Sequence, residues 1–184
     1  MSQIGVVRFS YLAYLSQPAS DRPIYKVLRQ HPVRKIVEMG VGDAVRTLRI
    51  LEMASAFQPS IEIHYAGIDL FEARLANQPG MTLKAAYKLL RQLPVRSQLI
   101  PGDPLTALAR VANNLTGTDL LVIAADQDPQ QLARAWALVP RMLHDNSLVF
   151  LERSPKKHKC FDLLSRSELD ALITASKRQV RVAA

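Results

Sequence analysis

A turn rich in small residues is the first candidate for ligand chemistry. Gly40 and Gly42, two of only seven glycines in the chain, follow the apolar run that begins near Val33 and ends at Met39. A glycine lets the backbone approach a ligand closely, because no Cβ atom occupies the space between them. A tight strand-to-helix turn would also explain the two glycines, so the spacing alone leaves both interpretations open.

Acidic residues stand at the ends of the strands that the sequence predicts. They are Glu38, Asp69, Asp103, Asp126 and Glu152. In an open sheet of parallel strands, ligands bind beyond the carboxyl ends of the strands, near the point where the strand order reverses. The recurrence of an acid at each end therefore predicts a polar ligand site along one edge of the sheet.

Several of these acids also have a simpler structural explanation. Asp43 and Asp103 precede predicted helices and could serve as N-caps; the cap is favoured for Asp43, and both roles stay open for Asp103. Glu38 could orient the glycine turn or meet a charged group of a ligand. Asp69 is harder to explain by structure alone, because an acid that closes a buried strand needs a partner.

The sequence predicts no metal site and identifies no catalytic residue. Asp126, Asp128 and Glu152 supply oxygen atoms of the kind that magnesium prefers. Asp128 precedes Pro129, however, and this pair is more typical of a helix start than of a metal ligand. The histidines show no metal-ligand spacing, and the single cysteine, Cys160, excludes both a cysteine zinc cluster and an internal disulfide.

Strands and helices alternate along most of the chain. Apolar runs predict strands over 35–39, 61–69, 97–100, 119–124 and 147–152, with a short closing strand over 178–183. Helical spacing, caps and prolines predict helices over 20–31, 43–57, 80–93, 103–115, 128–143 and 165–176. The last helix begins with a capping box of Ser165 and Glu168. This alternation predicts an α/β protein, a three-layer Rossmann-like sandwich with a mostly parallel sheet of about six strands.

The chain divides into two predicted parts. Residues 1–32 form an N-terminal helical or lid segment, and residues 33–184 form the Rossmann-like domain. Within the first part, the stretch VVRFSYLAYL at 6–15 could be a short strand or an apolar helical turn. The tyrosines of this part could belong to a lid, although local core packing is the favoured role.

Composition and charge restrict the partners. With 184 residues, of which 48% are apolar and 22% charged, the chain is long enough to bury a sizeable core. The formal net charge is +8, and the run RSPKKHK at 153–159 makes nucleic acid a possible partner, although a solvated loop is favoured. The apolar runs are too short to span a bilayer and the N-terminus lacks a signal pattern. We therefore expect a cytoplasmic protein without membrane contact, of open oligomeric state.

Several segments together resemble a known family. The turn EMGVGDA at 38–44 departs from the dinucleotide-binding pattern G-x-G-x-x-G/A, because Val45 stands where the third small residue belongs. It resembles instead the first motif of the class I S-adenosylmethionine-dependent methyltransferases. AGIDLFEAR at 66–74 resembles the second motif of that family, and LIPGDPL at 99–105 resembles the third. The resemblance covers residues 33–184.

This resemblance implies S-adenosylmethionine as the cofactor. In the family the glycine turn lies against the amino-acid and ribose portions of the cofactor. The acid that ends the second strand, here Asp69, accepts hydrogen bonds from both ribose hydroxyls, and Asp103 would contact the adenine amino group. The implied cofactor-binding residues are Glu38, Gly40, Gly42, Asp69, Leu70, Asp103 and Asp126. The family usually has one strand more than we expect here, with a reversed last hairpin.

The function that the resemblance implies is transfer of a methyl group from S-adenosylmethionine to an unidentified acceptor. One alternative is an inactive methyltransferase-like binding module that acts through its basic C-terminal face. Another is a nucleotide-sugar or dinucleotide enzyme on a related sheet, against which Val45 argues. Ala124 stands where many small-molecule methyltransferases have an acid, which bears on whether the chain is catalytically active. The acceptor stays open, because a likeness of fold does not give the substrate.

Overall fold

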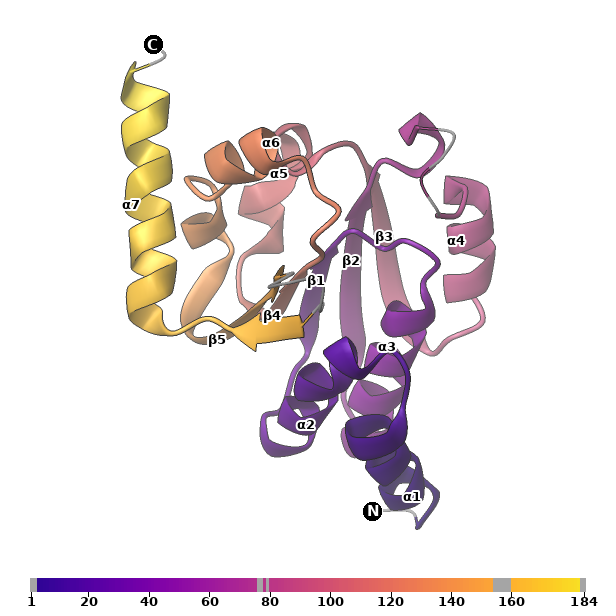
Figure 1. Ribbon diagram of the computed structural model, residues 1–184. Coiled ribbons are helices and arrows are strands. Elements are labelled where there is room, and N and C mark those ends of the chain that lie inside the picture. The colour runs from indigo at the N-terminus through magenta and orange to yellow at the C-terminus, as the bar shows by residue number, and fades with distance from the viewer. Residues whose placement is uncertain (1–2, 76–77, 79, 154–159, 183–184) are drawn as a thin grey trace.

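A computed structural model describes residues 3–75, 78, 80–153 and 160–182 (Figure 1). Within these residues six strands form one sheet: β1 (Lys35–Met39), β2 (Ile63–Asp69), β3 (Val95–Pro101), β4 (Thr118–Ile123), β5 (Leu143–Arg153) and β6 (Cys160–Leu163). The strand order is β3-β2-β1-β4-β5-β6. The first five strands run parallel, and β6 runs antiparallel to β5. The first five predicted strands and their parallel pairing are confirmed.

The strand order reverses at β1. The chain proceeds outward from β1 to β2 and β3, and then crosses back to the other side of β1 for β4 and β5. Met39 pairs with Ile68 of β2 and with Ile123 of β4, so the three central strands end at the same level. In sheets of this kind a ligand binds beyond the carboxyl ends of the strands at the reversal.

Helices cover both faces of the sheet (Figure 1). On one face lie α1 (Gln3–Ser10), α2 (Arg22–Gln30), α3 (Val45–Phe57) and α4 (Leu83–Leu90), and on the other lie α5 (Pro104–Val111), α6 (Pro129–Ala135) and α7 (Arg166–Val182). Successive side chains of β1 alternate between the two cores, as the pleat of a strand requires. Ile36 packs with the first group of helices, and Val37 and Met39 pack with the second. The predicted three-layer Rossmann-like sandwich is confirmed.

The N-terminal stretch is helical rather than extended. A π-helical turn over Tyr11–Leu15 follows α1, so the helical alternative for this stretch is confirmed. Leu12 and Tyr25 are fully buried in the core that β1 and α3 share. Tyr11 and Tyr14 are exposed, so core packing explains only one of the three tyrosines.

Two predictions of secondary structure are wrong. Residues 178–182 belong to α7 and not to a closing strand, because no glycine or proline interrupts the helix after its cap. The sixth strand is β6, a hairpin partner of β5 in which Phe161 is buried. The predicted helix over 128–143 ends at Ala135, because a 3-10 turn that contains Pro140 separates α6 from β5.

The basic run at 153–159 lies, apart from Arg153, outside the described residues. Arg153 itself is paired with Asp162 at 3.9 Å and with Glu168 at 3.3 Å. The prediction about nucleic acid therefore stays a prediction. Within the described residues, none of the helices has the apolar length that crossing a bilayer requires.

We expect the capping box of α7 to contribute measurably to stability. The hydroxyl of Ser165 accepts the amide N–H of Glu168 at 3.3 Å, and Glu168 accepts the amide of Ser165 at 2.9 Å, as predicted. Ser165→Ala should lower the free energy of unfolding by about 1 kcal/mol, the usual effect of losing an N-cap side chain. Urea denaturation measures the difference, with the exposed Ser60→Ala as the control. Equal stability of the two variants would contradict this role.

Candidate functional site

A cavity at the carboxyl edge of the sheet has a volume of about 720 Å³. This volume lies in the range of small-molecule sites. The cavity is lined by the 18–21 segment before α2, by the turn between β1 and α3 with the start of α3, by residues that follow β2 and β4, and by Glu152 near the end of β5. The lining residues are Pro18, Ala19, Ser20, Asp21, Gly40, Val41, Gly42, Asp43, Val45, Arg46, Arg74, Gln78, Ala124, Asp126 and Glu152.

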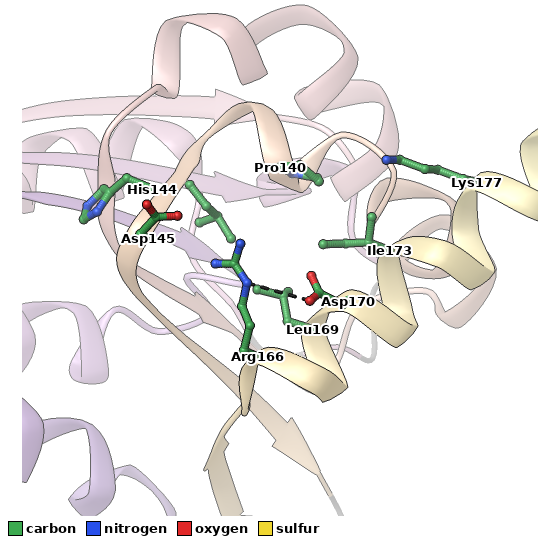
Figure 2. Close-up of a pocket in the computed structure, with 9 residues that line it drawn as sticks. Pro140, His144, Asp145, Arg166, Leu169, Asp170, Ile173 and Lys177 are labelled. Carbon is green, nitrogen blue, oxygen red and sulfur yellow. Dashed lines mark ion pairs between the residues drawn. The ribbon is translucent and has the colours of Figure 1, made fainter.

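A second cavity, shown in Figure 2, lies away from this edge. It has a volume of about 230 Å³ and lies between α7 and the amino end of β5. Arg166 and Asp170 form an ion pair at 3.8 Å on the α7 side of this cavity. His144, which also lines it, is hydrogen-bonded through Nε2 to Oδ1 of Asp119 at 3.0 Å. Ligands of open α/β sheets bind at the opposite ends of the strands, so we take the larger cavity as the candidate site.

The two glycines of the first turn serve different purposes. Both have a positive φ, 90° at Gly40 and 62° at Gly42, which glycine adopts without strain. A Cβ atom on Gly40 would lie 2.7 Å from the Cβ of Ala124 and 2.7 Å from Oδ1 of Asp126, so this position is filled by the loop after β4. A Cβ atom on Gly42 would meet nothing within 4 Å. The loop after β4 therefore fills the space at Gly40, whereas the space at Gly42 is open.

Glu38 supports the turn after β1 through a network of buried hydrogen bonds. Its side chain is fully buried and accepts hydrogen bonds from Arg46 at 2.7 Å, from the hydroxyl of Thr47 at 2.5 Å and from the hydroxyl of Tyr65 at 2.7 Å. Arg46 also donates to the carbonyl oxygen of Gly40 at 2.5 Å. Burial lowers the pKa of Arg46, but the neighbouring Glu38 outweighs burial and raises it above its ordinary value. Glu38 does not line the cavity and reaches it through Arg46.

Asp69 joins the ends of β1 and β2. Its carboxylate accepts the amide N–H of Gly42 at 2.9 Å and that of Phe71 at 3.0 Å. The guanidinium of Arg74 donates to both carboxylate oxygens, with Nε at 2.8 Å from Oδ1 and a second nitrogen on Oδ2. Burial raises the pKa of Asp69, but these hydrogen bonds outweigh burial and leave the pKa below its ordinary value. Asp69 is therefore ionised at neutral pH.

Beside the main cavity lies a small one of about 30 Å³, lined in part by Asp69, Leu70 and Asp103. Asp103 caps α5, because its Oδ1 accepts the amides of Leu105 at 2.9 Å and Thr106 at 3.0 Å. Burial raises the pKa of Asp103, yet these bonds and that of the Thr106 hydroxyl bring it below its ordinary value. The cap role of Asp103 is thus present, and the carboxylate still borders the small cavity.

The loop after β4 supplies a further acid to the site. Asp126 borders both cavities and accepts Arg74 at 3.0 Å and the side-chain amide of Gln127 at 2.7 Å. Asp128 caps α6 by accepting the amide of Gln131 at 2.8 Å, as expected of a helix start. Within the described part of the chain, no group of three His, Cys, Asp or Glu side chains could hold a metal ion.

Two buried acids face the cavity from its other side. Asp21, which is 3% exposed, accepts the hydroxyl of Ser20 at 3.0 Å and that of Tyr25 at 3.4 Å. Glu152 at the end of β5 is 9% exposed and accepts the amide of Ala125 at 2.9 Å. Burial raises the pKa of Asp21, Arg46 opposes that increase, and the negative charge of Glu152 adds to it.

Comparisons with known proteins reveal the fold. No protein-family model and no curated protein matches the chain. Among solved structures, one described as an O-methyltransferase from Klebsiella pneumoniae matches with a TM-score of 0.56 and 12% identity, over 97% of this chain and 78% of that one. One described as a caffeoyl-CoA O-methyltransferase from Staphylococcus aureus matches with a TM-score of 0.53 and 14% identity, over 98% and 83% of the two chains. The chain shares their fold.

A third methyltransferase structure has the same fold. It is described as a protein-L-isoaspartate O-methyltransferase from Plasmodium falciparum in complex with S-adenosyl-L-homocysteine. It matches with a TM-score of 0.53 and 10% identity, over 84% of this chain and 68% of that one. Within the described residues the sheet of this chain has six strands, and the last of them, β6, runs antiparallel to β5.

Sequence reasoning missed three residues of this site. Arg46 and Arg74 both pair with a buried acid that the sequence identified, and Asp21 comes from the segment before the sheet. The signal for Arg74 is its position in AGIDLFEAR, five residues after the strand-end acid. An arginine on a short loop can fold back and form an ion pair with a carboxylate a few residues earlier in the chain, as Arg74 does with Asp69. No comparable signal identifies Asp21, because its neighbours in the site come from distant parts of the chain.

The buried Asp21 makes the stability of the protein depend on pH. Because the pKa of Asp21 is raised in the folded state, that state holds the proton more tightly than the unfolded chain does. The contribution of Asp21 to folding stability is therefore fully present below its unfolded pKa of about 3.9, and it is lost as the pH rises through the raised pKa of the folded state. Asp21→Asn carries no charge, so its stability relative to the wild type should increase between about pH 3.5 and about pH 7.

Denaturation curves of both proteins at the two pH values measure this difference. Asp43→Asn, which removes an exposed carboxylate from the same cavity, is the matched control. A difference for Asp21→Asn that does not change with pH would contradict the raised pKa.

Proposed function

We propose that the protein transfers a methyl group from S-adenosylmethionine to an acceptor that is not yet identified. The observation that carries the proposal is the hydrogen bond from the amide of Gly42 to Asp69 at 2.9 Å. It brings the glycine turn after β1 and the acid that ends β2 together beside a cavity, in a chain with a methyltransferase fold. These are the two elements that the family uses for the ribose side of the cofactor.

The residues present fit such a cofactor. The open direction at Gly42 leaves room for its amino-acid and ribose portions, and Asp69 supplies an ionised carboxylate for the ribose hydroxyls. Leu70 and Asp103 border the small cavity, and the resemblance assigns Asp103 to the adenine amino group. Gly40 and Asp126 pack closely where the turn after β1 meets the loop after β4. Glu38 orients the turn through Arg46, which donates to the carbonyl oxygen of Gly40.

The charge of the cavity supports a cationic ligand. Among its described lining residues, four are carboxylic acids (Asp21, Asp43, Asp126 and Glu152) and two are arginines. The sulfonium of S-adenosylmethionine makes its methyl group electrophilic, so the protein has mainly to align the donor with the acceptor. In this proposal residues 1–32 form the lid that contributes Pro18 to Asp21, and residues 33–184 bind the cofactor.

Calorimetric titration with S-adenosylmethionine, S-adenosylhomocysteine and NAD tests the proposal. We expect both methyltransferase ligands to bind and NAD not to bind. Binding of NAD alone would indicate a dinucleotide enzyme. A folded protein that binds none of the three would leave an inactive methyltransferase-like module as the better description.

A further inference from the structure

The carboxylate of Asp69 is fully engaged by the protein itself. A carboxylate has two oxygens with about four lone-pair positions for hydrogen bonds. Oδ1 accepts the amide of Phe71 and Nε of Arg74, and Oδ2 accepts the amide of Gly42 and a second nitrogen of Arg74. Four donors thus fill the four positions, and the two hydroxyls of a ribose could not donate to Asp69 until two of these donors leave.

Only Arg74 can leave without unfolding the site. The amides of Gly42 and Phe71 belong to the backbone turns that follow β1 and β2, and their positions are fixed by those turns. The guanidinium of Arg74, in contrast, is at the end of a flexible side chain. It contributes both of the remaining donors, which is the number that a ribose diol would replace.

We propose that Arg74 is an internal competitor of the cofactor: its guanidinium occupies the ribose position on Asp69, and its displacement from that position sets the affinity for the cofactor. The inference rests on the proposed function and concerns the same site. Arg74 borders both the cavity of about 720 Å³ and that of about 30 Å³. Its departure from Asp69 would remove a side chain that borders both cavities.

A second acid retains the displaced arginine. Arg74 already donates to Asp126 at 3.0 Å, and the Asp126 side chain is 39% exposed. The guanidinium can therefore leave Asp69 and keep a charged partner at the rim of the cavity. Gly80 leaves room for the arginine in its position on Asp69, because a Cβ atom at residue 80 would lie 2.8 Å from Nε of Arg74.

The competition has a thermodynamic consequence. The Arg74 side chain is 9% exposed, and its paired hydrogen bonds to Asp69 are charge-assisted, whereas those of ribose hydroxyls come from neutral donors. Because the bonds of Arg74 to the buried Asp69 are charge-assisted, the closed arrangement is the more populated one in the free protein. A ligand that binds only the minor, open arrangement shows an apparent affinity reduced by the fraction of open molecules. Arg74 therefore stabilises the free protein and weakens cofactor binding.

Titration of S-adenosylhomocysteine into wild type, Arg74→Met and Arg74→Lys tests this inference. Methionine keeps the length of the side chain without donors, and lysine keeps the charge without the paired donors. We expect Arg74→Met to bind about tenfold more tightly than the wild type or better, with Arg74→Lys between them. Arg96→Met, which removes an exposed arginine of β3, is the charge-matched control and should bind like the wild type.

Thermal melts accompany the titrations. Without ligand, Arg74→Met should melt below the wild type, because Asp69 loses its charged partner, and S-adenosylhomocysteine should raise its melting temperature by more than it raises that of the wild type. Equal or weaker binding by a folded Arg74→Met would overturn the inference while leaving the proposed function in place. Failure of both folded proteins to bind would overturn the proposed function as well. Binding by Arg74→Met alone would support the inference.

Discussion

Asp69→Asn should lower the free energy of unfolding by about 3 kcal/mol, the effect of breaking a buried ion pair by removing one partner. The Asp69 and Arg74 side chains are 2% and 9% exposed, so the arginine would keep its charge without its principal counter-ion. The amide of asparagine adds a conflict. Each carboxylate oxygen faces one backbone N–H and one arginine nitrogen, so the asparagine NH₂ would face two donors in either orientation.

The effect of Asp69→Asn on ligand binding is best measured in the Arg74→Met background. In the wild-type background the substitution weakens the acceptor for ribose but also releases Arg74, and these two effects oppose each other. Without the arginine, Asp69→Asn should weaken S-adenosylhomocysteine binding roughly ten- to a hundredfold, the range for losing a hydrogen bond to a charged group. Calorimetric titration measures this ratio.

Asp43→Asn is the matched control for both measurements. Its carboxylate borders the same cavity but is exposed and accepts one amide, that of Val45 at 3.0 Å, which an asparagine oxygen can also accept. Stability should change little, and binding should be weakened far less than by Asp69→Asn, because Asp43 is exposed and contributes only to the overall charge of the cavity. If Asp69→Asn in the Arg74→Met background binds as well as its parent, the assignment of Asp69 to the ribose is wrong, although the fold is unaffected.

Alanine at Gly40 should destabilise the protein far more than alanine at Gly42. Both positions have a positive φ, and any residue with a Cβ atom there lowers the free energy of unfolding by about 1 kcal/mol. At Gly40 the Cβ atom would also lie 2.6 Å from the side-chain amide of Gln127 and 2.7 Å from the Cβ of Ala124. Such overpacking should lower the free energy of unfolding by about a further 2 kcal/mol. Urea denaturation of Gly40→Ala and Gly42→Ala measures the difference directly.

A larger side chain at Gly42 separates binding from folding. A Cβ atom there meets nothing within 4 Å and lies at the wall of the cavity, so valine would fill space that the proposed cofactor needs. Gly42→Val should therefore lose binding of S-adenosylhomocysteine, and its positive φ should lower the free energy of unfolding by about 1–2 kcal/mol. Tight binding by this variant would show that the ligand does not approach the turn at this glycine.

The sequence by itself determined the order and type of most elements. Apolar runs gave the five parallel strands, and helix caps gave the starts of α5, α6 and α7, because these signals are local: a cap needs only a side chain and the next few amides. The acids at the strand ends were also predictable. Once the strands are parallel, Asp69, Asp103 and Asp126 must come to the same edge.

The tertiary structure decided which partner each of these residues has. The last strand is β6 and not 178–183, because an edge strand is defined by the neighbour with which it pairs, here β5, while a helix without a stop signal continues. The two glycines look alike in sequence, yet only Gly40 faces the loop after β4, which lies more than eighty residues away along the chain. Arg74 and Asp126 are held together across the site for the same reason: ion pairs depend on distance in space, and the fold alone sets that distance.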